Sequence, residues 1–178
     1  MLADRGLEAV WFARPNAFAW LTGGDNVVDR HAPVGTAAAG YDGDGVTVVT
    51  DTIEGPRLRA EELPDDVRLV TVPWYESSLA AAVAEHSPAP AGADFDVPGF
   101  ERVDGSDLRQ PLTPDDRATY RTLGQATAAA VEATCREVGP DTTERETAAD
   151  VRRALASRGI DAPVVLAGGG DRAPKYRH

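Results

Sequence analysis

The sequence contains little cysteine, little lysine and no long apolar run. Its 178 residues include one cysteine, Cys135, so no disulfide can form within the chain and cysteines alone cannot build a zinc site. Cys135 lies in the helical pattern AAAVEATCREVG, which favours a structural residue over a nucleophile. No stretch approaches the ~20 apolar residues that span a bilayer. The start, MLADRGLEAVWF, lacks the basic and apolar regions of a signal peptide. We therefore expect a cytoplasmic protein that does not enter a membrane.

The charge is strongly one-sided. The formal net charge is −11, and Lys175 is the only lysine beside 17 arginines. The acidic residues are spread along the chain and do not form a tail, which indicates a salt-adapted, halophilic-type protein; a cationic partner is the alternative. Nucleic-acid binding needs a basic face, so this charge argues against it.

The first part of the chain has the pattern of short α/β units. A helix end at residues 1–5 stops at Gly6, and Asn16 is expected to cap a short helix closed by Gly23 and Gly24. The DGDG turn at 42–45 predicts a β-hairpin. The residues from 87 to 99, rich in Pro, Gly and Ala, predict a loop or linker. We expect strands at 7–13, 36–41, 46–50 and 67–74, and helices at 52–63 and 76–86.

The second part, after about residue 110, predicts two helices and one strand. Thr113 before Pro114 and two acids is a helix start. Thr143 and Glu146 form a capping box for the second helix. Residues 163–167 (PVVLA) predict a strand, followed by three glycines. About 65 residues with one unpaired strand make a poor independent fold, which indicates the opening part of a larger domain.

Four segments in this order resemble the creatinase/aminopeptidase P/prolidase family, the hydrolases with the pita-bread fold. They are GLEAVWFARPNAFAWLTG, LTPDDRATYRTLGQATAAAVEAT, GPDTTERETAADVRRALASRGI and VVLAGGGDRAPKYRH. The resemblance implies an α/β fold: a creatinase-type N-terminal domain at residues 1–108, with a mixed sheet and flanking helices. It implies that an incomplete, truncated α+β pita-bread catalytic domain follows at 109–178.

The same resemblance implies where an active site would lie. His178 matches the family's substrate-side histidine and is the candidate catalytic residue. Arg172, Lys175 and Arg177 precede it and could bind an anionic substrate group, although a solvated basic turn fits them equally well. His31 and His86 lack partners at metal-ligand spacing and are expected to be structural or surface residues.

Metal-dependent members hold two divalent ions, Mn, Co or Zn, on five side chains that follow this histidine. The resemblance therefore implies no metal ligand within this chain. For the intact protein it implies an Xaa-Pro aminopeptidase or dipeptidase that acts on a peptide or small-molecule substrate as a homodimer. Two alternatives stay open: a metal-free creatinase-like hydrolase that uses His178 as base, and a non-catalytic homologue that acts in binding or dimerisation.

Overall fold

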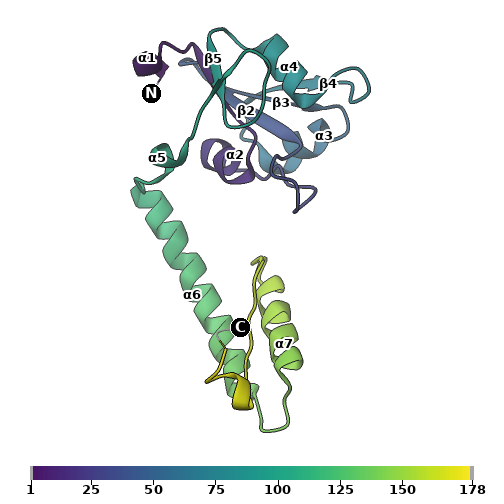
Figure 1. Cartoon of the computed structure of the whole chain (residues 1–178), viewed down its shortest axis with the longest axis vertical. Helices are drawn as coiled ribbons and strands as arrows, with labels where there is room; N and C mark the ends of the chain where they lie inside the picture. Colours follow the sequence, from purple (N-terminus) through teal and green to yellow (C-terminus); the bar gives the residue numbers. More distant parts are fainter. Residues whose placement is uncertain (1, 177–178) are drawn as a thin grey trace. The chain divides into compact units, whose positions relative to one another are not determined.

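A computed structural model describes residues 2–176 of the chain. These residues form two compact units, divided after Pro111. The first unit is built on a mixed six-stranded sheet with the strand order β4-β3-β2-β1-β5-β6 (Figure 1). The strands are β1 (Ala9–Phe12), β2 (Ala37–Tyr41), β3 (Val46–Asp51), β4 (Arg68–Val72), β5 (Ala91–Ala93) and β6 (Glu101–Arg102). The predicted α/β fold with a mixed sheet and flanking helices is confirmed.

The strand pairing combines a hairpin with parallel neighbours. β2 is antiparallel to β1 and to β3, while β3 and β4, β1 and β5, and β5 and β6 run parallel. The predicted hairpin turn joins β2 and β3, where the Asp42 carboxylate accepts the backbone N–H groups of Asp44 and Gly45 at 3.0 and 3.1 Å. These two hydrogen bonds are the main reason why the pKa of Asp42 is lowered.

Helices cover both faces of this sheet. Trp11 and Val49 point to the face covered by α4 (Leu79–His86), which contributes Ala82 and Val83. Their neighbours along the strands pack on the other face, which is covered by Ala17 and Phe18 of α2 (Pro15–Thr22). The alternation follows from the two-residue period of a strand. The other helical segments of this unit are α1 (Leu2–Arg5), α3 (Gly55–Arg57), the π-helical η1 (Leu58–Glu62) and α5 (Ser106–Arg109).

Two sequence predictions in this unit were wrong. The segment 87–99, expected to be a loop, contains β5, an interior strand paired on both sides. Helix α2 begins two residues earlier than expected: Arg14 is its N-cap and Pro15 its first residue, so Asn16 lies inside the helix. Proline is favoured at the first helical position because it has no N–H to leave unpaired.

The second unit consists of α6 (Pro114–Glu137), α7 (Glu144–Ala156) and an extended segment that ends in the short 3₁₀ helix η2 (Gly170–Arg172). Both helices have a complete capping box, made by Thr113 with Asp116 and by Thr143 with Glu146. The predicted strand at 163–167 is extended but forms no ladder. A strand needs a hydrogen-bonded neighbour, and the described residues of this unit offer none.

Candidate functional site

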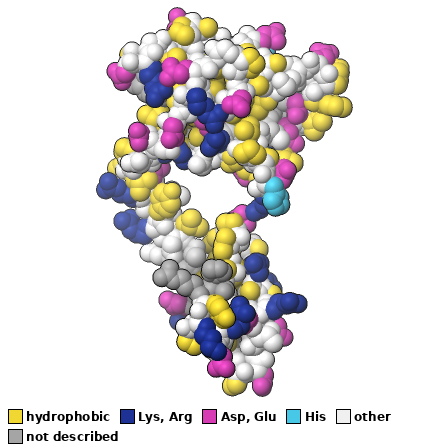
Figure 2. Space-filling model, in the orientation of Figure 1, with side chains coloured by type: hydrophobic (Ala, Val, Ile, Leu, Met, Phe, Trp, Pro, Cys, Tyr) yellow, Lys and Arg dark blue, Asp and Glu magenta, His cyan; other side chains and the backbone are white. Residues whose placement is uncertain are grey.

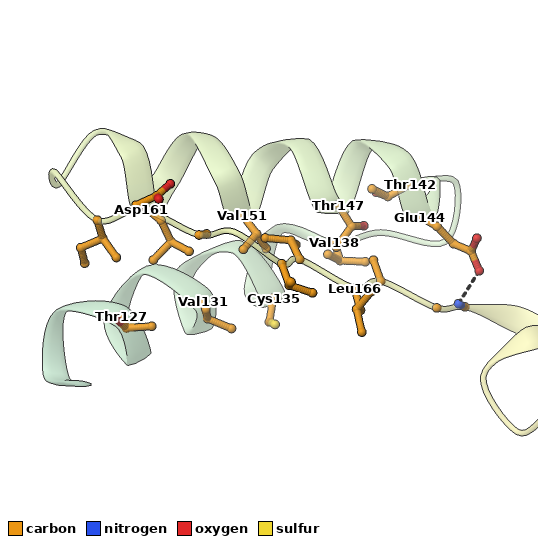
Figure 3. Close-up of a pocket in the computed structure, with 18 of the residues that line it drawn as sticks. Thr127, Val131, Cys135, Val138, Thr142, Glu144, Thr147, Val151, Asp161 and Leu166 are labelled. Atoms are coloured by element: carbon orange, nitrogen blue, oxygen red, sulfur yellow. Dashed lines mark hydrogen bonds between the residues drawn. The ribbon is translucent and has the colours of Figure 1, made fainter. Parts of the chain in front are cut away.

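The glycine-rich segment from Gly168 to Tyr176 is fixed at the start of α7. The Gly169 N–H donates a hydrogen bond to Glu144 Oε1 at 2.8 Å (Figure 3). Arg172 Nε lies 3.4 Å from the same carboxylate oxygen. Gly170 adopts a φ of 52°, a conformation that favours glycine. Glu144 therefore contacts this segment, which we call the Gly168–Tyr176 turn, at two points.

The structure places two of the four predicted site residues. Arg172 contacts Glu144 and lies over the ring of Tyr176, with 5.6 Å between its guanidinium carbon and the ring centroid. Lys175 is exposed, and its backbone N–H donates to the carbonyl of Arg172 at 3.0 Å. Arg177 and His178 lie outside the described residues. Anion binding by this turn and catalysis by His178 both remain predictions.

An apolar pocket of about 730 Å³ lies beside the turn. Its walls come from α6, α7 and the extended segment, and Figure 3 shows their side chains turned toward one another. Val131, Val151 and Leu166 are typical of the lining, and the Cys135 side chain joins them. Leu166 is 64% exposed, so this surface is apolar but not closed. Its aliphatic lining can bind apolar groups but offers little acid–base chemistry.

The described residues do not fit a metal centre. Within residues 2–176, no three His, Cys, Asp or Glu side chains are grouped so that they could hold an ion. His31 is exposed with Asp29 as its neighbour, its Nδ1 3.5 Å from Oδ1. His86 is the last residue of α4, where the helix dipole favours a cation. No described helix is long and apolar enough to cross a membrane.

A polar constellation that the sequence did not indicate lies in the first unit. Asp94, only 4% exposed, follows β5 directly. Its Oδ1 accepts the Ala13 N–H at 2.8 Å, and both its oxygens accept the Arg14 N–H at 3.3–3.4 Å. Burial raises the pKa of Asp94 more than these hydrogen bonds lower it. Asp94 thus fixes the corner between β1 and α2.

Comparison with known proteins gives a fold relationship. No protein-family model matches the chain, and no curated protein matches it. Among solved structures, prolidase from Pyrococcus horikoshii OT3 superposes with a TM-score of 0.66 at 16% identity, over 88% of this chain and 46% of that chain. Prolidase from Pyrococcus furiosus superposes with a TM-score of 0.63 at 19% identity, over 88% of this chain and 47% of that chain. X-Pro aminopeptidase from Thermotoga maritima MSB8 gives 0.61 at 12%, over 88% and 49%.

These comparisons confirm the predicted resemblance at the level of fold. The match runs through most of the chain, so it includes residues of both units. The chain spans about half the length of the solved structures it matches.

Proposed function

We propose that this chain forms the N-terminal portion of an Xaa-Pro aminopeptidase- or dipeptidase-like hydrolase. The observation that carries the proposal is the similarity to prolidases and an X-Pro aminopeptidase across 88% of the chain, at TM-scores above 0.6. In this proposal residues 1–111 are the non-catalytic domain. The second unit begins the catalytic domain, and its open apolar surface packs against the remainder of that domain.

Substrate recognition is assigned to the turn that Glu144 holds. Lys175 is exposed there and carries a positive charge, so it can pair with the free carboxylate of a dipeptide. Arg172 is already paired with Glu144 and mainly shapes the turn. Arg177 and His178 follow along the chain. The family resemblance gives His178 a catalytic role, whereas the substrate-binding role proposed for Arg177 rests on its charge. A metal-dependent enzyme of this kind would use two divalent ions bound outside residues 2–176.

The test is hydrolysis by the protein translated from the whole reading frame that encodes this chain. Ala-Pro, Ala-Ala and creatine are supplied with Mn²⁺, Co²⁺ or Zn²⁺, or with a chelator, and the released products are quantified. Metal-dependent cleavage of Ala-Pro in preference to Ala-Ala is expected. The 178-residue chain alone is the matched control and should release no product, because its described residues lack a metal cluster.

Substitution of Lys175 separates substrate recognition from catalysis. Lys175→Met should raise KM for Ala-Pro about tenfold, with little change in kcat, because a charge-assisted pair is lost. KM for the amide of Ala-Pro, which lacks the carboxylate, should not change. Equal effects on both substrates would remove Lys175 from recognition. Chelator-resistant creatine hydrolysis would overturn the metallopeptidase assignment, and no turnover of any substrate would overturn the enzymatic one.

A further inference from the structure

A second, polar pocket lies wholly within the first unit and has a volume of about 370 Å³. It is formed where the parallel strands β1, β5 and β6 reach their carboxyl ends. Arg14 follows β1, Arg102 ends β6 and Arg109 ends α5, and all three line the pocket. In open α/β sheets, this edge is where ligands bind. Three of the chain's arginines thus meet at one pocket of an otherwise acidic protein.

The arginines keep donor groups that their protein contacts do not use. Arg14 donates through Nε to the Asp94 carbonyl at 3.0 Å, which leaves its two terminal nitrogens for a ligand. Arg102 pairs through one terminal nitrogen with the fully exposed Asp96 at 3.0 Å. Arg109 makes only long hydrogen bonds of 3.4 Å, to the Gly105 carbonyl and to Ser106 Oγ. Because a guanidinium carries five N–H donors, each arginine has several left.

The acidic residues of the pocket, by contrast, already accept hydrogen bonds. Asp94 accepts backbone N–H groups of Ala13 and Arg14. Asp104 Oδ1 accepts from the Ser106 N–H at 2.9 Å and from its hydroxyl at 2.6 Å. These hydrogen bonds are the main cause of the lowered pKa of Asp104, and the charges of Arg109 and Arg14 lower it further. The pocket therefore has a surplus of donors over acceptors, which suits a ligand rich in oxygen acceptors.

We propose that this pocket binds a small oxyanion, a carboxylate or phosphate group, held by Arg14, Arg102 and Arg109. Guanidinium groups pair with both anions through parallel N–H···O bonds. Because the site lies entirely in the first unit, the proposal goes beyond the hydrolase function and does not depend on it. It would hold equally if the protein proved to have no peptidase activity.

The experiment titrates the 178-residue chain with sodium phosphate and, separately, sodium acetate. Sodium chloride keeps the ionic strength constant, and binding is followed by calorimetry and by the ¹⁵N–¹H NMR signals of Gly105 and Ser106. Arg102→Gln and Arg109→Gln should each weaken binding about tenfold, since each removes a charge-assisted contact. Arg102→Lys keeps the charge but loses the fork geometry, so it should weaken binding less.

The matched control is Arg68→Gln, which removes the same charge from the exposed start of β4, the strand at the opposite edge of the sheet. It should change the affinity less than about twofold because screening weakens distant charges. Binding of phosphate alone, or of acetate alone, supports the site and identifies the anion. The proposal would be overturned if Arg68→Gln weakened anion binding as much as the pocket variants do. It would also be overturned if neither phosphate nor acetate shifted the NMR signals of Gly105 and Ser106 more than chloride does.

Discussion

Replacing Asp94 by alanine tests how the first unit holds the corner between β1 and α2. The carboxylate of Asp94 is 4% exposed and accepts the Ala13 N–H at 2.8 Å. Ala13 itself is fully buried, so water cannot take over as acceptor. The substitution therefore leaves a buried backbone donor unpaired and also removes the weaker bonds to the Arg14 N–H.

The expected loss follows from these contacts. An unsatisfied buried donor costs about 1–3 kcal/mol, and bonds to a charged acceptor lie in the upper part of that range, so we expect a loss of about 2 kcal/mol. With a urea m-value of about 1.5 kcal/mol/M for a domain of this size, the midpoint should fall by about 1.3 M. The matched control is Asp96→Ala. That fully exposed carboxylate pairs only with Arg102, so the midpoint should hardly move.

Tryptophan fluorescence is the suitable assay because it reports on the first unit alone. All three tryptophans, Trp11, Trp20 and Trp74, lie before residue 112. Trp11 is 2% exposed and should give most of the signal change on unfolding. Unchanged m-values would show that both variants unfold from a comparable native state. A midpoint for Asp94→Ala no lower than that for Asp96→Ala would refute the role given to this carboxylate.

Three further predictions concern pH, helix capping and core packing. Burial raises the pKa of Asp94 in the folded protein above the ordinary 3.8. The free energy of unfolding of the wild-type protein should therefore fall relative to that of Asp94→Asn as pH rises from 3.8 through the folded value. Urea melts from pH 4 to 7 would contradict this if the two proteins' stabilities changed in parallel. Thr143→Ala should lower the local free energy of unfolding of α7 by about 1 kcal/mol, as measured by amide hydrogen exchange. The pKa of Glu146 is lowered first by the backbone N–H of Thr143 and second by its hydroxyl. Alanine keeps the N–H and removes the hydroxyl, so the pKa should return only part of the way toward 4.5 in a ¹³C titration, and an unchanged value would contradict the hydroxyl bond. In wild type that bond stabilises above 4.5 and is lost as pH falls through the lower folded value. Gly40→Ala places a methyl group 2.5 Å from the buried Trp11 ring. The free energy of unfolding, measured in fluorescence-detected melts, should fall by about 3 kcal/mol. An unchanged free energy, as expected if position 40 were open, would contradict this.

Local chemistry explains which elements the sequence could predict. The DGDG hairpin turn, the Thr113 cap and the Thr143–Glu146 capping box depend on residues within three positions of each other, and all form as predicted. The strand at 163–167 has the right composition but forms no ladder, because a ladder needs a partner that the described residues do not provide. Pattern alone therefore predicts capped helices and tight turns better than strand pairing.

Strand β5 was missed because its sequence, Ala-Gly-Ala, has low strand propensity. Tertiary packing selects these small residues. An added Cβ on Gly92 would lie 2.4 Å from the Val103 side chain and 3.1 Å from that of Leu7. The strand is held on both sides by parallel neighbours, β1 and β6, so pairing outweighs propensity. An interior strand made of small residues looks like a linker when only its sequence is considered.

The polar pocket was missed for a related reason, and Asn16 shows it most clearly. Single-sequence rules favour asparagine as an N-cap, but Pro15 takes the first helical position, and no side chain of the preceding residue caps α2. Asp94, about 80 positions away, instead fixes the backbone leading into the helix. Asn16 is thereby released from capping and stands exposed in the lining of the pocket. On the surface view, cationic and acidic side chains of the first unit lie intermixed, so colour by charge alone does not reveal the site (Figure 2). What distinguishes it is that its carboxylates already accept hydrogen bonds, whereas its guanidinium groups keep N–H donors that their protein contacts do not use.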